Sequence, residues 1–205
     1  MPSAAFQQSM PFILRWEGGF VDHPADPGGR TNKGVTQRTY DKWRARQGVP
    51  AKDVKLIDDA EVHAIYESDY WLPPRCELLP DPLHLVQFDT AVNMGVGRAV
   101  RLLQRCVGCT ADGDFGPNTE QAVSGCDAGD TVRAYCDARE AYYRNLAEKR
   151  PDLKVFLKGW LNRLDALRRE VGLANRERAF SLAPDFGDTG YIAPVPDFDD
   201  DPRDF

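Results

Sequence analysis

Long apolar runs are missing from this 205-residue chain, although 42% of its residues are hydrophobic. A helix that crosses a membrane needs about 20 consecutive apolar residues, so we expect no membrane-spanning segment. Residues 1–6 lack the basic and apolar regions of a secretory signal peptide. We therefore expect synthesis in the cytoplasm without a signal peptide.

The common motifs of metal and nucleotide sites are also missing. Neither a His-Glu-x-x-His motif nor a P-loop is present. Cys106 and Cys109 form a C-x2-C pair, but no second pair with zinc-site spacing follows, which favours structural or incidental thiols over a metal or redox role. The loop that begins at Asp112 resembles a calcium loop, but its twelfth position is Val123 instead of Glu. We expect neither a metal nor a cofactor.

The chain has no excess of positive charge outside its C-terminal tail. Residues 181–205 contain seven Asp and one base, which accounts for the net charge of -6, and residues 1–180 hold 25 acidic and 25 basic residues. A nucleic-acid-binding domain usually carries a basic patch and a high pI. The composition therefore gives no support for a nucleic-acid partner.

A buried glutamate is predicted near the N-terminus. Apolar residues recur with helical spacing before it, at Phe6, Met10, Ile13 and Leu14. Gly18 and Gly19 then end the helix, which places Glu17 on its last turn. The negative end of the helix dipole and the aromatic neighbours Trp16 and Phe20 should both raise the pKa of Glu17. A carboxylic acid that stays protonated near neutral pH suits general acid catalysis.

The residues around this glutamate form a recognisable motif. They are Glu17, Gly18, Gly19, Phe20, Asp22, Pro24, Asp26, Gly28, Gly29, Thr31, Gly34 and Thr36. The motif resembles the N-terminal signature of the glycoside hydrolase family 108 muramidases, a family that includes phage-type endolysins and proteins once called secretion activators. The resemblance implies cleavage of the peptidoglycan glycan strand, with Glu17 as the catalytic acid.

A second carboxylate is predicted in the loop after Glu17. In phage-type lysozymes an Asp lies nine residues after the helix-end Glu, and a Thr lies six residues after that Asp. In this chain Asp26 lies nine residues after Glu17, and Thr31 lies five residues after Asp26. We predict Asp26 as the second carboxylate, with Asp22 in reserve at the substrate-binding face, and Thr31 or Thr36 as the residue that positions water. The alternative for both aspartates is turn capping, because Asp next to Pro or Gly often bonds its own backbone.

Two further helices are expected to wall the cleft, and a third is expected to lie buried at the centre of the fold. Thr36 should cap a helix through about residue 47, and a capping box at Asp58–Glu61 should open one that stops at Pro73. Asp81 followed by Pro82 predicts the start of a third, nearly all-apolar helix that ends near residue 95 or 97.

Aromatic and amide side chains on these helices are candidates for sugar binding. Tyr66 and Tyr70 combine an apolar face with a hydroxyl, as sugar recognition requires, but their spacing equally fits a core face. Asn93 is a polar exception on the apolar helix, where it either faces the cleft or makes a cap or core hydrogen bond.

The second half of the chain resembles a peptidoglycan-binding module. The resemblance rests on Arg98-Ala99, Leu102-Leu103-Gln104 and the run from Asp112 to Thr119. Pro117 should start a helix after that run. A helix over 130–150 and another over 153–171 should follow, separated by Pro151. The last helix carries Trp160, for which we expect a core position, and its residues 158–163 also resemble the C-terminal helix of the family.

Taken with the resemblance, the sequence predicts a mainly α (α+β, lysozyme-like) fold: a helical bundle with a short β-hairpin after the first helix. We expect a catalytic lobe at 1–96, a helical peptidoglycan-binding lobe at 97–178 and an acidic, disordered tail at 179–205. We interpret the tail as a solubilising segment; the alternative is that residues 191–196 dock on the protein itself or on a partner.

The expected function is that of a lysozyme or endolysin that cleaves the β-1,4 bond between N-acetylmuramic acid and N-acetylglucosamine. A lytic transglycosylase and a non-catalytic export or lysis helper that binds peptidoglycan are the alternatives. We expect a monomer that acts on glycan strands in the periplasm or cell wall after release by a holin or a secretion system.

Overall fold

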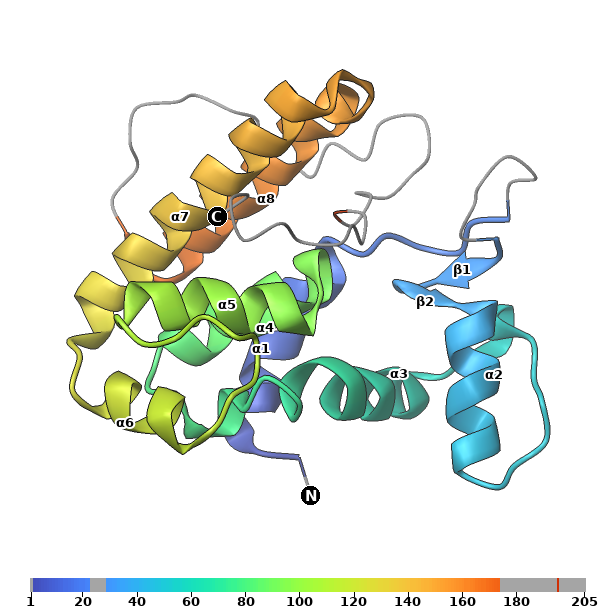
Figure 1. The fold of residues 1–205 in the computed structure, drawn as a ribbon. Helices are drawn as coiled ribbons and strands as arrows, with labels where there is room; N and C mark the ends of the chain where they lie inside the picture. Colours follow the sequence, from blue (N-terminus) through green and yellow to red (C-terminus); the bar gives the residue numbers. More distant parts are fainter. Residues whose placement is uncertain (1, 23–28, 174–194, 196–205) are drawn as a thin grey trace.

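The computed structural model describes residues 2–22, 29–173 and Val195. Within them the chain forms helices α1 (Ala4–Arg15), α2 (Gln37–Arg46), α3 (Asp59–Tyr66), α4 (Leu83–Met94), α5 (Val96–Cys106), α6 (Pro117–Ser124), α7 (Ala128–Lys149) and α8 (Leu157–Glu170) (Figure 1). A two-stranded hairpin, β1 (Thr31–Asn32) and β2 (Val35–Thr36), follows α1. The predicted mainly helical, lysozyme-like fold with a hairpin after the first helix is confirmed. None of the described helices has the length and apolar character needed to cross a membrane.

The hairpin is closed by a two-residue turn. Lys33 and Gly34 both have positive φ angles, of 50° and 76°, as a type I′ turn requires. The register pairs Thr31 with Thr36 and Asn32 with Val35, and Val21 adds an isolated bridge to Thr31. This bridge brings the segment after α1 against the hairpin.

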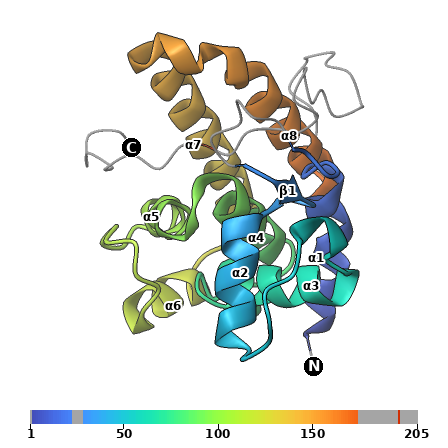
Figure 2. The ribbon, with the colours of Figure 1, turned by 90° about the vertical axis from the view of Figure 1, so that its right-hand side faces the viewer.

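Helix α4 is the centre of the core. Every residue of α4 except Val92 is buried, which confirms the predicted central helix. It packs against α1, α5 and α7, while α7 and α8 run side by side (Figures 1 and 2). On one side, Phe88 meets the rings of Phe6 and Trp71 at centroid distances of 5.6 and 5.3 Å.

Several predicted helix starts are confirmed. Thr36 caps α2 through a 3.1 Å hydrogen bond from the Thr39 backbone amide, the Asp58–Glu61 capping box opens α3, and Pro117 is the first residue of α6.

Other predicted boundaries are wrong. The Asp81–Pro82 peptide is cis and α4 begins at Leu83, so Asp81 is not its cap. After α3 the chain continues as a π-helical turn, Glu67–Trp71, instead of an α-helix. The segment Pro151–Phe156 is a 3-10 helix, and α8 starts only at Leu157. Shorter 3-10 turns lie at Val54–Leu56 and Cys76–Leu78.

Candidate active site

Glu17 lies just beyond the C-terminal end of α1. The helix ends at Arg15, Trp16 is its cap, and Gly18 takes a φ angle of 68°, which an L side chain rarely adopts. The expectation that Glu17 occupies the last helical turn is therefore wrong by two residues. Glu17 is only 9% exposed, and the Trp16 side chain beside it in sequence is buried. The local structure thus holds a carboxyl group at the edge of the core.

The hairpin tip approaches Glu17 closely on one side. A Cβ atom added to Gly34 would lie 2.6 Å from Glu17 Oε2 and 2.2 Å from the Tyr66 hydroxyl. That hydroxyl donates a 3.0 Å hydrogen bond to the Lys33 carbonyl and so ties α3 to the turn. Only glycine fits at position 34, because both its backbone conformation and its neighbours exclude a side chain.

The other carboxylate oxygen of Glu17 meets an arginine from the far end of the chain. Arg163 of α8 donates from Nη1 to Glu17 Oε1 at 2.7 Å and from Nε to Asp89 Oδ1 at 2.8 Å. Arg139 of α7 donates from Nη1 to the second Asp89 oxygen at 2.6 Å. Residues from four separate parts of the fold therefore form one buried chain of alternating charges.

A neutral hydrogen-bond network continues from this charged chain. Arg139 Nε contacts the Tyr143 hydroxyl at 2.6 Å, and that hydroxyl donates to Asn93 Oδ1 at 2.6 Å. The Thr90 hydroxyl lies 3.1 Å from Arg139 Nη1. The Asp89 carboxylate and the Asn93 side-chain oxygen of the apolar helix α4 thus have partners on α7 and α8, whereas the side-chain nitrogens of Gln87 and Asn93 are buried without a hydrogen-bond partner among the described residues.

Burial raises the pKa of Glu17, and the nearby Arg163 guanidinium opposes that rise without cancelling it. Asp89 raises the pKa of Glu17 further by like-charge repulsion. Burial alone would also raise the pKa of Asp89, but Arg163 and Arg139 outweigh it and hold that pKa below its usual value. Asp89 is therefore the ionised member of the pair, and Glu17 is the carboxyl group suited to carry a proton.

The predicted raised pKa of Glu17 is confirmed, with burial as its largest cause, but Phe20 is more exposed than an apolar neighbour of the carboxyl group was expected to be. Phe20 is 36% exposed, and the cationic groups of Arg30 and Lys55 lie over its ring at 5.6 and 5.3 Å. A half-exposed ring that carries two cations does not form an apolar wall for a carboxyl group.

The loop residues predicted beside Glu17 differ in their surroundings. The Asp22 side chain is 54% exposed and pairs with Arg30 at 3.2 Å. Thr31 is buried and donates from its hydroxyl to the Gly29 carbonyl at 3.1 Å, whereas the Thr36 hydroxyl caps α2. Asp26 lies outside the described residues. The catalytic and substrate-binding roles of these four residues stay predictions.

The predicted sugar-binding residues are mostly part of the core. Tyr66 is buried and packs edge-on against Phe88 at 6.4 Å, with Tyr70 tilted against it at 5.7 Å. Asn93 is 1% exposed and accepts the core hydrogen bond from Tyr143 described above. The core alternatives for Tyr66 and Asn93 are confirmed, and a role in sugar binding stays a prediction.

Two other sequence expectations concern the second half of the chain. Trp160 is fully buried and stacks on Tyr143 at a centroid distance of 5.4 Å, which confirms its core position. The predicted tail lies outside the described residues except for Val195. Val195 is 5% exposed and donates its backbone amide to the Asn93 carbonyl at 2.8 Å, so this point of residues 191–196 contacts α4 of the protein itself.

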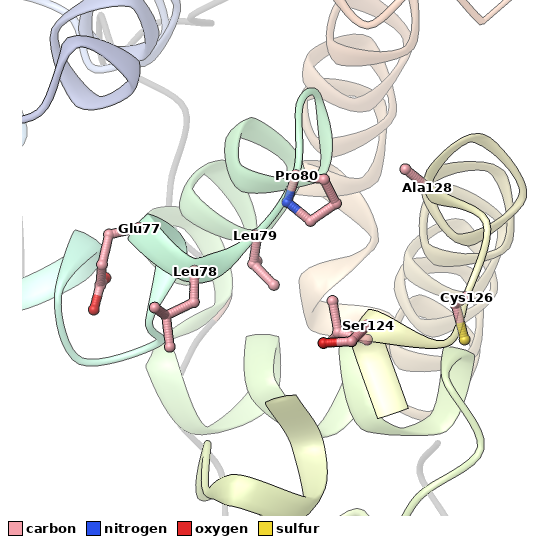
Figure 3. Close-up of a pocket in the computed structure, with 8 residues that line it drawn as sticks. Glu77, Leu78, Leu79, Pro80, Ser124, Cys126 and Ala128 are labelled. Atoms are coloured by element: carbon pink, nitrogen blue, oxygen red, sulfur yellow. The ribbon is translucent and has the colours of Figure 1, made fainter. Parts of the chain in front are cut away.

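A cavity of about 450 Å³ is lined by residues other than Glu17 (Figure 3). Its lining combines the 3-10 turn Cys76–Leu78 and the residues after it with the end of α6 and the start of α7. The lining residues include none of the predicted site residues; they are Glu77, Leu78, Leu79, Pro80, Val123, Ser124, Cys126 and Ala128. The cavity is therefore not part of the Glu17 site. All five cysteines, Cys126 included, are free thiols.

The sequence analysis missed Arg163, Asp89 and Arg139 as parts of the site. One signal for Asp89 was present, because a charged residue on an otherwise apolar helix needs a buried partner. The sequence did not identify that partner, because Arg163 lies 74 positions later in the chain.

Comparisons with known proteins identify the family of the chain. A family model described as Glycosyl hydrolase 108 matches residues 10–95, and one described as Predicted Peptidoglycan domain matches residues 98–165. The chain is similar to the structure of Brucella abortus SagA with a TM-score of 0.70 and 35% sequence identity, covering 85% of this chain and 98% of that chain. The chain belongs to glycoside hydrolase family 108.

This membership gives the general function. A family 108 catalytic segment followed by a peptidoglycan domain identifies the chain as a glycoside hydrolase that acts on peptidoglycan. In this family 108 enzyme, Glu17 belongs to the first matched segment and Arg163 to the second. A comparison with curated proteins finds no match.

Proposed function

We propose that this family 108 enzyme is a muramidase, which hydrolyses the β-1,4 bond between N-acetylmuramic acid and N-acetylglucosamine. The observation that carries the proposal is the Glu17 carboxyl group, whose pKa is raised by burial at the junction of α1, the hairpin and α8. A general acid for a glycosidic oxygen needs a pKa near the working pH, and burial is the usual way to reach it.

In the proposed reaction Glu17 protonates the bridging oxygen as the bond to the muramic acid anomeric carbon breaks. A water molecule supplies the new hydroxyl group at that carbon and loses its proton to a second carboxylate. We assign this second role to Asp26 and the orientation of water to Thr31, on the sequence spacing alone. The products are a reducing muramic acid end and a free glucosamine 4-hydroxyl.

The nature of the released ends tests the reaction. We expect mass spectrometry of fragments from purified peptidoglycan to show reducing muramic acid ends. Anhydro-muramic acid ends would instead establish a lytic transglycosylase, which closes a 1,6-anhydro ring without water. No release of fragments would favour a protein that only binds the wall.

The Asp26→Asn variant tests the second carboxylate. We expect kcat to fall by about 10²-fold or more with the fold unchanged. Turnover near that of the wild type would mean that Asp26 only caps a turn. Asp22→Asn would then be the next variant to measure.

A further inference from the structure

The two oxygens of Glu17 have different surroundings. Oε1 accepts a hydrogen bond from Arg163 Nη1 at 2.7 Å, and Oε2 is the oxygen that approaches Gly34. A guanidinium group only donates hydrogen bonds, so Glu17 Oε1 must act as an acceptor toward Arg163. A proton on Oε1 that pointed at Arg163 would prevent this hydrogen bond. The acidic proton of Glu17 therefore belongs on Oε2.

Arg163 is itself held in place from its other side. Its Nε donates to Asp89 Oδ1 at 2.8 Å, while Arg139 occupies Asp89 Oδ2 at 2.6 Å. All three side chains are buried, and their elements, α8, α4 and α7, pack together in the core. Paired, charge-assisted hydrogen bonds of this kind fix the direction of a guanidinium group.

We propose that Arg163 is a positioning residue for the general acid: it binds Glu17 Oε1, directs the proton to Oε2, and stabilises the carboxylate that forms when that proton is transferred. The proposal rests on the proposed function of Glu17. If Arg163 has this role, the segment matched by the peptidoglycan domain contributes a residue to the catalytic site of the segment that precedes it.

The charges around Glu17 support this role. Among the described residues, Glu17 is influenced by Arg163 from α8, Asp89 from α4, Tyr66 at the end of α3 and Tyr70 in the turn that follows. Of these groups only Arg163 carries a positive charge. Its attraction to Glu17 grows as the proton leaves, which is the kind of interaction that lowers a barrier instead of only strengthening binding.

Two variants with opposite expected effects test the proposal. In a plot of kcat/KM against pH, the fall at high pH, here called the high-pH limb, reports the loss of the proton from Glu17. Arg163→Met removes the charge that favours the carboxylate, so we expect the limb to move to higher pH by about 1–3 units and kcat to fall by about 10²-fold. Asp89→Asn removes a repelling charge, so we expect a smaller shift of the same limb to lower pH.

Arg168→Met is the matched control. Arg168 is also a buried arginine on α8, with ion pairs to Glu140 at 2.8 Å and Asp165 at 3.2 Å, but it does not contact Glu17. We expect this variant to lose stability and to keep both kcat and the high-pH limb. A similar limb shift in Arg168→Met would mean that the effect is general loosening of α8.

Arg163→Lys keeps the charge but lacks the fork that reaches Glu17 and Asp89 together. We expect a limb like that of the wild type with kcat reduced about tenfold. If Arg163→Met fails to fold, this variant decides, and an unchanged kcat in Arg163→Lys overturns the positioning role.

The outcomes separate this inference from the proposed function. A folded Arg163→Met variant with an unmoved limb overturns the role of Arg163, provided that Glu17→Gln is inactive. If Glu17→Gln keeps wild-type activity, the proposed general acid itself is wrong, whatever Arg163→Met does.

Discussion

Gly34 offers the sharpest test of the close contact between the hairpin and Glu17. In Gly34→Ala the new Cβ would lie 2.6 Å from Glu17 Oε2 and 2.2 Å from the Tyr66 hydroxyl, distances that force both groups to move. The φ angle of 76° adds about 1–2 kcal/mol of backbone strain for any L side chain. A displacement of about 1 Å at a catalytic group costs about 10²-fold in rate, so we expect kcat to fall by about that factor.

The chain provides a matched control at Gly48. It has a φ angle of 70°, but a Cβ added there meets nothing within 4 Å. Gly48→Ala should therefore carry the same backbone strain and keep wild-type turnover of purified peptidoglycan. Thermal unfolding of both variants shows whether they are folded at the assay temperature. A folded Gly34→Ala enzyme with the kcat of the wild type would refute the close approach of the hairpin to Glu17.

Three other predictions concern stability. Tyr66→Phe removes the hydrogen bond to the Lys33 carbonyl and should lower the free energy of unfolding in urea by about 1 kcal/mol, whereas an unchanged value would mean that this bond contributes nothing. Burial alone would raise the pKa of Glu61, but hydrogen bonds from Tyr40 and Lys52 outweigh it and hold the pKa at about 2. Because that pKa is lowered, the ionised Glu61 contributes about 1–3 kcal/mol of stability that the wild type loses as pH falls from 4.5 toward 2. Unfolding of Glu61→Gln measured over the same pH series should lack this part of the loss. Val195→Asp places a carboxylate at a position that is 5% exposed, so we expect the free energy of unfolding to fall by about 1–3 kcal/mol, and an unchanged melting temperature would show that Val195 contributes no burial.

Local signals in the sequence predicted much of the fold. The Thr36 cap and the Asp58–Glu61 capping box satisfy helix-end amides through neighbours a few residues away, and Pro117 has no amide hydrogen to satisfy, so a short window contains the cause in each case. The apolar character of α4 likewise predicted a central helix. The π-helical turn after α3 was not predicted, because its periodicity resembles that of an α-helix over so few residues.

The candidate site was predicted only where its determinants are local. Glu17 was identified from the motif around it, and burial raises its pKa as expected. The hydrogen bond to Arg163 joins residues 146 positions apart, and no periodicity or spacing encodes such a contact. The surroundings of Phe20 were not predicted for a related reason: two cations, Arg30 just before β1 and Lys55 in the segment after α2, lie over its ring.

The most direct test of the catalytic assignment compares the wild type with Glu17→Gln. Glutamine keeps the size of the side chain and an oxygen that accepts the Arg163 hydrogen bond, but it has no acidic proton. With both proteins shown to be folded by thermal unfolding, we predict that only the wild type releases reducing muramic acid ends from purified peptidoglycan. Release of these ends by Glu17→Gln at the wild-type rate would contradict the role of Glu17 as the general acid.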